Sequence, residues 1–276
     1  HDRRERGQEW LGRCHYLAKA DAARREVLAA HPSADIEVFQ ADLGDLDTVR
    51  AAAEAIRQKV DGIDAVINNA GIMMLPEREL TPQGCEKQLG VNHMAHFALN
   101  GWLADLVEAR GGRFVGTSSV AHRAGRIDQA DLLCERSYGA ITAYGQSKLA
   151  NLMYVFELDR RLKQAGKRAV AIGCHPGYSA TNLQTTGPSS FMGSLMSLSN
   201  ALVAQKAAHG AWPTLLAAFE PEAERGGYYG PTSFGDSRGP VGLSTVAKQA
   251  RDTEVAAWLW ERSVEMTGVD WAEFGL

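Results

Sequence analysis

The chain has 276 residues, of which 45% are hydrophobic and 22% are charged, and its formal net charge is −4. A chain of this size can bury a large core, either as one large α/β domain or as two small ones. This charge balance does not favour a nucleic-acid surface, and no apolar run approaches the roughly 20 residues that a membrane-spanning helix needs.

The four cysteines lie far apart in the sequence and form no CxxC pair. This spacing is typical of reduced thiols and argues against a disulfide framework or a zinc site. The sequence also has no recognisable signal-peptide pattern. We therefore expect a cytoplasmic protein.

The first thirty residues follow no regular pattern. Residues 1–9 are polar, residues 13–17 favour a short strand, and residues 18–30, which are rich in Ala, Arg and Glu, favour a helix. The stretch His31-Pro-Ser-Ala-Asp35 has the composition of a turn. We therefore treat residues 1–30 as an atypical N-terminal segment and residues 31–276 as a single domain.

From residue 36 onwards, short apolar strands alternate with helices. Strands are predicted at 36–41, at 65–68 before a tight polar turn, at 113–119 and at 169–174. Helices are predicted after Asp42, with Val49, Ala53, Ile56 and Val60 on one face, and at 83–109, 144–162, 205–219 and 255–264. Such alternation predicts parallel βαβ units in a sheet that helices cover on both faces.

Polar and glycine residues follow several of these strands. Asp42, Asn69-Ala70-Gly71, Ser119 and Pro176-Gly177 each lie where a predicted strand ends. The carboxyl ends of parallel strands meet at one edge of a sheet, which is where ligands of such sheets gather. These residues are therefore expected to lie together at a ligand site.

Tyr144 and Lys148 are four residues apart at the start of a predicted helix. Side chains at this spacing share one helical face, so the phenol and the ammonium group are expected to lie together. A neighbouring positive charge lowers the pKa of a tyrosine, and a lowered pKa suits general acid–base work near neutral pH. An ordinary surface helix also accounts for the spacing when it is taken alone.

Five short stretches together resemble one known family. They are Asn68-Asn-Ala-Gly71, Gly90-Val-Asn92-His-Met-Ala-His96-Phe97, Thr117-Ser-Ser119-Val-Ala-His122, Tyr144-Gly-Gln-Ser-Lys148-Leu-Ala-Asn151 and His175-Pro-Gly-Tyr-Ser-Ala-Thr181. In their order and spacing they are similar to the short-chain dehydrogenase/reductase family, and above all to its retinol dehydrogenase and WW-domain oxidoreductase-like branch. The resemblance implies a Rossmann-like, doubly wound parallel sheet in three layers, and hydride transfer with NAD or NADP.

The resemblance also implies a role for each catalytic residue. Tyr144 is expected to donate and accept the proton, and Lys148 to lower the pKa of that tyrosine and to bind the nicotinamide ribose. Ser119 is expected to bind the substrate oxygen, and Asn92 to anchor a water beside the lysine. No metal is expected, because His93 and the nearby His96 are joined by no set of carboxylates or cysteines.

Cofactor contacts follow from the same resemblance. Asp42 and Leu43 align with residues beside the adenine, and Asn69, Ala70 and Gly71 with the turn beside its ribose. The nicotinamide side is expected at Pro176, Gly177 and Thr181. The full set of expected cofactor residues is Asp42, Leu43, Asn69, Ala70, Gly71, Thr117, Tyr144, Lys148, Pro176, Gly177 and Thr181.

The chain departs from the family at its glycine-rich phosphate turn, TGxxxGxG. Before residue 36 the glycines are Gly7 and Gly12, and neither follows a buried strand. The first βα unit is therefore expected to be absent or replaced, and dinucleotide binding to be weak. An alternative reading is a non-catalytic relic of the fold that binds no dinucleotide and acts as a partner or inactive subunit.

Downstream, residues 182–200 join a Gly/Pro/Ser stretch to several large apolar residues. This composition suits an apolar lid over a small hydrophobic alcohol or carbonyl substrate, although a core helix with a flexible lead-in explains it equally well. The apolar faces of the helices at 83–109 and 144–162, together with the family's habit of pairing there, predict a homo-oligomer.

Overall fold

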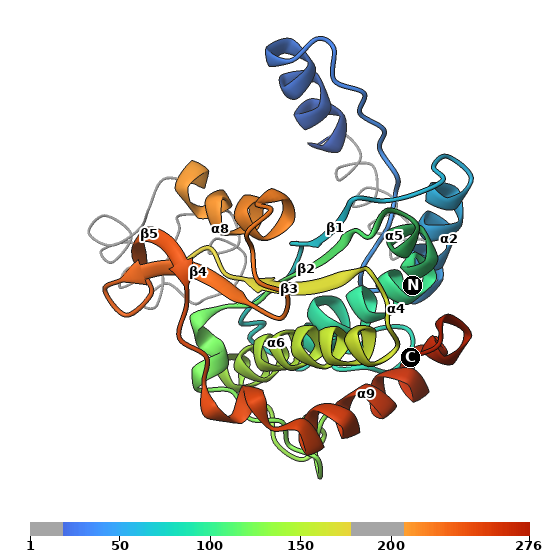
Figure 1. The fold of residues 1–276 in the computed structure, drawn as a ribbon. Helices are drawn as coiled ribbons and strands as arrows, with labels where there is room; N and C mark the ends of the chain where they lie inside the picture. Colours follow the sequence, from blue (N-terminus) through green and yellow to red (C-terminus); the bar gives the residue numbers. More distant parts are fainter. Residues whose placement is uncertain (1–18, 178–206) are drawn as a thin grey trace. The chain divides into compact units, whose positions relative to one another are not determined.

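The computed structural model (Figure 1) describes residues 19–177 and 207–276. Contacts within the chain divide it into two compact units, His1–Ala41 and Asp42–Leu276. In the described part of the first unit, residues 19–30 form a helix, as predicted, and Arg24 Nε donates a hydrogen bond to the Ile36 carbonyl (2.9 Å).

The strand predicted at residues 36–41 is not formed. These residues have no regular secondary structure. A strand exists only where a neighbouring strand takes up its backbone hydrogen bonds, and among the described residues no strand precedes Ala65 to supply them. The apolar pattern of residues 36–41 was therefore not sufficient to make a strand.

The described part of the second unit is built on a five-stranded sheet in the order β1-β2-β3-β4-β5. The strands are β1 (Ala65–Asn68), β2 (Arg113–Thr117), β3 (Val170–Cys174), β4 (Tyr228–Ser233) and β5 (Arg238–Leu243). The first four are parallel, and β5 pairs antiparallel with β4. The sequence predicted β1, β2 and β3 but not the β4–β5 hairpin.

Helices cover both faces of this sheet (Figure 1), so the predicted layered α/β architecture is confirmed. On one face lies α8 (Ala207–Phe219), and on the other lie α4, α6 and α9. The helices on that second side are α2 (Leu46–Arg57), α3 (Lys87–Leu89), α4 (Ala95–Trp102), α5 (Ala104–Arg110), α6 (Ala140–Gln164) and α9 (Thr253–Thr267). None of the helices within the described ranges is long and apolar enough to cross a membrane.

Helix α2 begins at a polar cap and ends earlier than its apolar pattern predicted. The Asp45 side chain accepts a hydrogen bond from the Asp47 N–H, and Val49 and Ala53 are buried. The helix ends at Arg57, so Val60 lies beyond it and is 40% exposed. Val60 was therefore wrongly placed on the same helical face as Val49 and Ala53.

The single helix predicted at 83–109 is broken into four pieces. The buried Glu86 carboxylate caps its start by accepting hydrogen bonds from the backbone of Gln88 (2.9 Å) and Leu89 (2.8 Å). A π-helical turn, η1 (Gly90–Met94), separates α3 from α4, and Leu103 separates α4 from α5. Such π-helical turns are frequent at functional sites.

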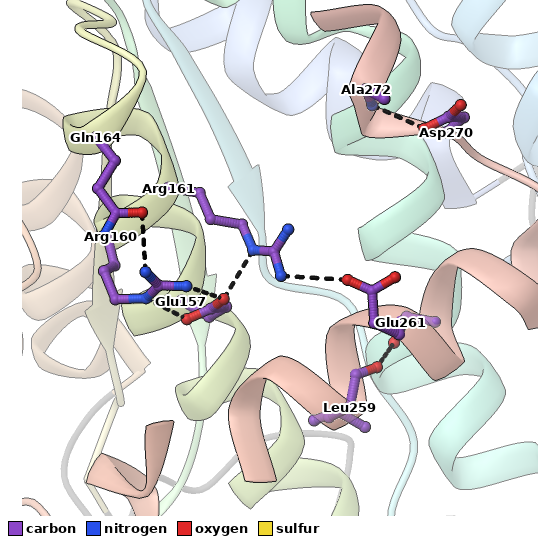
Figure 2. Close-up of polar contacts among 9 residues, drawn as sticks. Glu157, Arg160, Arg161, Gln164, Leu259, Glu261, Asp270 and Ala272 are labelled. Atoms are coloured by element: carbon purple, nitrogen blue, oxygen red, sulfur yellow. Dashed lines mark hydrogen bonds and ion pairs between the residues drawn. The ribbon is translucent and has the colours of Figure 1, made fainter. Parts of the chain in front are cut away.

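The C-terminal helix α9 packs on α4 and α6. Trp260 of α9 lies against Phe97 and Tyr154, with ring centroids 5.1 Å and 5.9 Å away. Figure 2 shows the polar edge of this contact, where Arg161 bridges the buried Glu157 of its own helix and Glu261 of α9. The predicted homo-oligomer stays a prediction, but this apolar surface is already covered by the chain's own C-terminal helix.

Candidate active site

Three parallel strands bring their carboxyl ends to one edge of the sheet. Strand β1 leads into Asn69-Ala70-Gly71, β2 into Ser118-Ser119, and β3 into His175-Pro176-Gly177. Because β2 pairs with both β1 and β3, these three segments are neighbours, as the sequence predicted.

Helix α6 is attached to the end of β2 by three hydrogen bonds. Ser118 Oγ donates to the Lys148 carbonyl (2.7 Å), and Lys148 Nζ donates to the Thr117 carbonyl (3.2 Å). Asn151 Nδ2 donates to the same Thr117 carbonyl (3.1 Å). The lysine of the Tyr144–Lys148 pair is thereby fixed at the strand end, and Ser118 and Asn151 are site residues that the sequence analysis missed.

Asn92, in the π-helical turn, holds the segment after β1. Its Oδ1 accepts a hydrogen bond from the Ile72 N–H (2.8 Å), and its Nδ2 donates to the Ile72 carbonyl (2.8 Å) and to Ser147 Oγ (2.9 Å). A Cβ added at Gly71 would lie 2.8 Å from Asn92 Oδ1 and 3.5 Å from Lys148 Nζ. Only glycine permits this close approach, which places Gly71, Asn92 and Lys148 side by side.

Tyr144 is 7% exposed and lies within hydrogen-bonding reach of the Ser119 side chain. Burial raises the pKa of Tyr144, and the hydrogen bond with Ser119 opposes that rise. The sequence predicted the opposite direction, from the charge of Lys148. Lys148 Nζ lies 5.9 Å from the centre of the Tyr144 ring and bonds the Thr117 carbonyl, so in this arrangement burial outweighs it.

Lys148 itself is buried, and this burial lowers its pKa from 10.5 to about 8, with a small opposing effect of Cys174. The neighbouring His96 is also buried, and this burial, together with the charge of Lys148, lowers its pKa to about 4. The charged form of Lys148 is therefore held in a buried environment that disfavours it, as is common for functional lysines.

A second polar network shapes the segment after Gly71. The Met74 N–H donates to Gln88 Oε1 (2.6 Å), and Gln88 Nε2 donates to the Tyr138 hydroxyl (3.1 Å), which in turn donates to the Leu75 carbonyl (2.7 Å). The sequence analysis missed Gln88 and Tyr138. Gln88 lies four residues before Asn92, and this helical spacing could have predicted that both side chains face the same segment.

The other predicted cofactor residues are placed as follows. Asp42 forms a tight turn in which its Oδ1 accepts from the Gly44 N–H (2.8 Å), and Leu43 is half-buried beside it. Gly44 lies close to Val91 of the π-helical turn. Asn69 and Ala70 are exposed. Thr181 and the predicted lid at 182–200 lie outside the described residues.

The histidines are engaged in hydrogen bonds. His93 Nε2 bonds Ser263 Oγ (2.9 Å), and His96 Nδ1 bonds the Asn92 carbonyl (3.0 Å). Over residues 19–177 and 207–276, no group of three or more His, Cys, Asp or Glu side chains is placed to hold a metal ion.

Comparison with known proteins gives consistent matches. A model of the short chain dehydrogenase family matches residues 11–189. The chain is 33% identical to retinol dehydrogenase 12 of Mus musculus over 260 residues, covering 94% of this chain and 78% of that protein. It is 34% identical to retinol dehydrogenase 13 of Homo sapiens over 271 residues, covering 96% of this chain and 78% of that protein.

A solved structure agrees with these matches. An uncharacterized protein from Mycobacterium Paratuberculosis is similar with a TM-score of 0.72 and 36% sequence identity, over 90% of this chain and 82% of that one. The family model spans more than half of the chain, and the relatives span most of it. The chain therefore belongs to the short-chain dehydrogenase/reductase family of NAD(P)-dependent oxidoreductases and is retinol dehydrogenase-like.

Proposed function

We propose that the chain transfers hydride between NAD(P) and an apolar alcohol or carbonyl, with Tyr144 as the general acid and base. One observation carries the proposal. Four side chains from separate parts of the chain lie together with Gly71 at the carboxyl ends of β1 and β2. They are those of Tyr144, Ser119, Lys148 and Asn92.

The residues at this edge fit a dinucleotide cofactor. Gly71 leaves its backbone open where a side chain would collide with Asn92, and the Lys148 ammonium lies beside it as a donor for ribose hydroxyls. We assign Lys148, Thr117, Pro176, Gly177 and Thr181 to the nicotinamide end. The residues assigned to the adenine end are Asp42, Leu43, Asn69, Ala70 and Gly71. When bound, NAD(P) supplies or accepts the hydride.

The chain's own residues handle the proton. The Tyr144 hydroxyl transfers a proton to or from the substrate oxygen, while the Ser119 side chain hydrogen-bonds that oxygen as charge develops on it. The raised pKa of Tyr144 keeps the phenol protonated, which suits carbonyl reduction. Lys148, with a pKa of about 8, exchanges protons readily near neutral pH.

Asn92 holds the site together rather than contacting substrate in this proposal. Its side-chain amide is engaged with Ile72 and Ser147, so it fixes the turn at Gly71 against Lys148. The water that the family resemblance places beside the lysine stays a prediction.

The apolar surroundings of the site support the proposed substrate class. The four residues that follow Gly71 directly, Ile72, Met73, Met74 and Leu75, are half-buried. The relatives in the comparison are named retinol dehydrogenases, and retinol is an apolar alcohol. We propose a substrate of this apolar class.

Replacing the phenol tests the proposal. Tyr144→Phe keeps the ring but removes the transferable proton, so turnover is expected to fall by about 10²–10⁴-fold while the circular dichroism spectrum is unchanged. Tyr154→Phe makes the same chemical change on the same helix. It removes a hydroxyl that accepts from Asn100 (3.0 Å), so it is expected to lower stability but to keep turnover.

The assignment of Tyr144 would be wrong if Tyr144→Phe turned over apolar carbonyls with NADPH as fast as the parent protein. Equal losses in both tyrosine variants would instead point to a shared effect on folding.

A further inference from the structure

The β4–β5 hairpin carries a buried carboxylate outside the proposed catalytic group. Asp236 lies in the turn of the hairpin, is 8% exposed and has a backbone φ of 65°. A non-glycine residue is uncommon in this left-handed region and persists there only where its surroundings hold it in place. The contacts of its side chain explain what holds it.

Three donors converge on one oxygen of Asp236. Its Oδ2 accepts hydrogen bonds from Ser244 Oγ (2.9 Å) and from the Thr245 N–H (3.0 Å). The Arg123 guanidinium forms an ion pair with the same oxygen, and it also donates to the Gly235 carbonyl (3.1 Å). Burial alone would raise the pKa of Asp236, but these hydrogen bonds and the Arg123 charge together hold it below its ordinary value, so the group is a carboxylate.

A hydrogen-bond chain leads from this carboxylate to the end of β3. Ser244 gives its single proton to Asp236, so it must accept from His175 Nε2, which lies 2.8 Å away. The other ring nitrogen, Nδ1, accepts from the Gly177 N–H (3.2 Å). His175 is therefore neutral with its proton on Nε2, and its buried position, which lowers its pKa to about 4, keeps it so.

The packing around His175 and Gly177 is tight. A Cβ at Gly230 would lie 1.9 Å from His175 Nε2. Gly177 has φ 70°, and a Cβ there would lie 2.5 Å from the Ser237 carbonyl oxygen. The Pro176-Gly177 turn is thus seated directly on the β4–β5 hairpin, with glycine required on both sides of the contact.

The same region also reaches the segment that carries Ser119. His122 Nε2 accepts from the Ala247 N–H (3.2 Å), so His122 Nδ1 carries the proton and donates to the Ser119 carbonyl (2.6 Å). The segment 244–247, directly after β5, therefore contacts one histidine from each of two neighbouring strand ends.

We propose that Asp236 is a positioning residue for the nicotinamide end of the cofactor site, acting through Ser244 and His175 on the Pro176-Gly177 turn. The inference rests on the proposed function, because that is where the turn receives its role. Asp236 fixes the Ser244 proton, Ser244 fixes the tautomer of His175, and His175 holds the Gly177 N–H. The backbone of the turn then presents one geometry to the cofactor before it binds.

Single and double variants test this chain. Ser244→Ala removes its middle member but leaves the Arg123–Asp236 ion pair, and Asp236→Asn removes the charge with little change of shape. Each is expected to weaken the binding of NADPH or NADH about tenfold in calorimetric titrations, as the loss of one ordering hydrogen bond does. The double variant is expected to bind no more weakly than either single variant, because both break the same chain.

Two controls separate positioning from general damage to the hairpin. Ser244→Thr keeps the hydroxyl and is expected to restore binding. Thr232→Val removes a different hydrogen bond of the same hairpin, from Thr232 Oγ1 to the Pro240 carbonyl (3.1 Å), and is expected to bind like the parent. The ¹⁵N chemical shifts of the His175 ring are expected to show a single Nε2–H tautomer in the parent and a mixture in Ser244→Ala.

The outcomes are distinct. Unchanged binding in Ser244→Ala, or losses that multiply in the double variant, would overturn the positioning role while leaving the proposed function intact. A parent protein that binds neither cofactor would overturn the proposed function and, with it, any role of the turn in cofactor binding. A lowered melting temperature with unchanged binding would make the chain of contacts purely structural.

Discussion

At the scale of single residues, the site combines groups that are costly to bury. Lys148 is buried, and within residues 19–177 and 207–276 its ammonium donates one hydrogen bond, to the Thr117 carbonyl. Its pKa falls from 10.5 to about 8 because burial penalises the charged form. The protein thus accepts a loss of stability at this position, which is common where a charged group serves a reaction.

The sign of this effect gives a prediction for Lys148→Met. Between pH 8 and 10.5 the unfolded chain binds more protons at this residue than the folded one, so stability rises with pH across that window. Below about pH 8 the full penalty applies, on the order of 3 kcal/mol for a shift of this size. Lys148→Met is therefore expected to be more stable than the parent at pH 7, with a difference that narrows towards pH 10.

Urea denaturation at pH 7 and pH 10 measures this difference. Lys163→Met is the matched control, because Lys163 is on the same helix but exposed, and it is expected to change little. A Lys148→Met protein that is less stable than the parent at pH 7 would mean that the Thr117 hydrogen bond outweighs the cost of burial.

Several single residues could be predicted from their spacing, and others could not. The four-residue spacing of Tyr144 and Lys148, and the position of Ser119 at a strand end, were enough to predict that these side chains lie close together. The pKa direction of Tyr144 did not follow from spacing, because it depends on how deeply the phenol is buried. Asp236 was also missed, because its role depends on contacts with residues more than a hundred positions earlier, such as Arg123.

At the scale of elements, the π-helical turn Gly90–Met94 decides where Asn92 points. Gly90 lies against Thr81, and a Cβ added at Gly90 would come within 2.6 Å of Thr81 Cγ2. The next nearest atoms belong to Cys85 and would be at ordinary contact distances of 3.6 Å and more. One methyl group therefore makes glycine necessary at this position.

This contact gives a paired prediction. Gly90→Ala is expected to lower the free energy of unfolding by about 1–3 kcal/mol, as overpacking in a buried site does. Thr81→Ser removes the methyl group but keeps the Oγ that accepts from the Cys85 N–H (3.1 Å). In the Thr81→Ser background, Gly90→Ala is expected to leave the free energy of unfolding unchanged or to raise it by up to about 1 kcal/mol, because alanine has a higher helix propensity than glycine.

Chemical denaturation of the four proteins in this cycle, with cofactor binding as a second readout, checks the prediction. The same loss of stability from Gly90→Ala in both backgrounds would show that Thr81 is not the neighbour that matters.

The elements themselves were only partly predictable. Alternating apolar runs identified β1, β2, β3 and the long helix α6, because these are buried on the sheet or against it. The β4–β5 hairpin was missed, because its strands contain glycine and proline, and because none of the six β5 residues is fully buried: three are half-buried and three are exposed. The break at Gly90–Met94 was missed because an apolar pattern of helical period continues straight through it.

At the scale of the whole molecule, the C-terminal segment completes the core. Trp271, in the short helix η5 (Trp271–Phe274), is 1% exposed. Its ring lies 5.7 Å from Phe97, 6.2 Å from Phe114 and 5.2 Å from Trp260 between ring centres. It therefore joins α4, β2 and α9 in one aromatic cluster, over the helical faces that the sequence assigned to an oligomer.

This cluster leads to a prediction about both stability and association. Trp271→Ala is expected to lower the free energy of unfolding by about 3–5 kcal/mol, as large aromatic truncations in a core do. It also uncovers apolar surface of α4, so the variant is expected to associate or aggregate at micromolar concentration. Trp212→Ala is the control, because Trp212 is 50% exposed on α8, and its loss is expected to change stability by less than about 1 kcal/mol.

Urea denaturation of the parent and both variants measures the change in stability, and sedimentation velocity measures their association. Because α9 and the C-terminal segment cover α4 and α6, any oligomer of the parent is expected to use another surface. Arg161→Glu reverses a charge at the edge of that covered face. This variant is then expected to have the same sedimentation coefficient as the parent. If the parent is an oligomer and the Arg161→Glu variant is a monomer, the two long helices form the interface after all. In that case α9 must move aside when two chains associate.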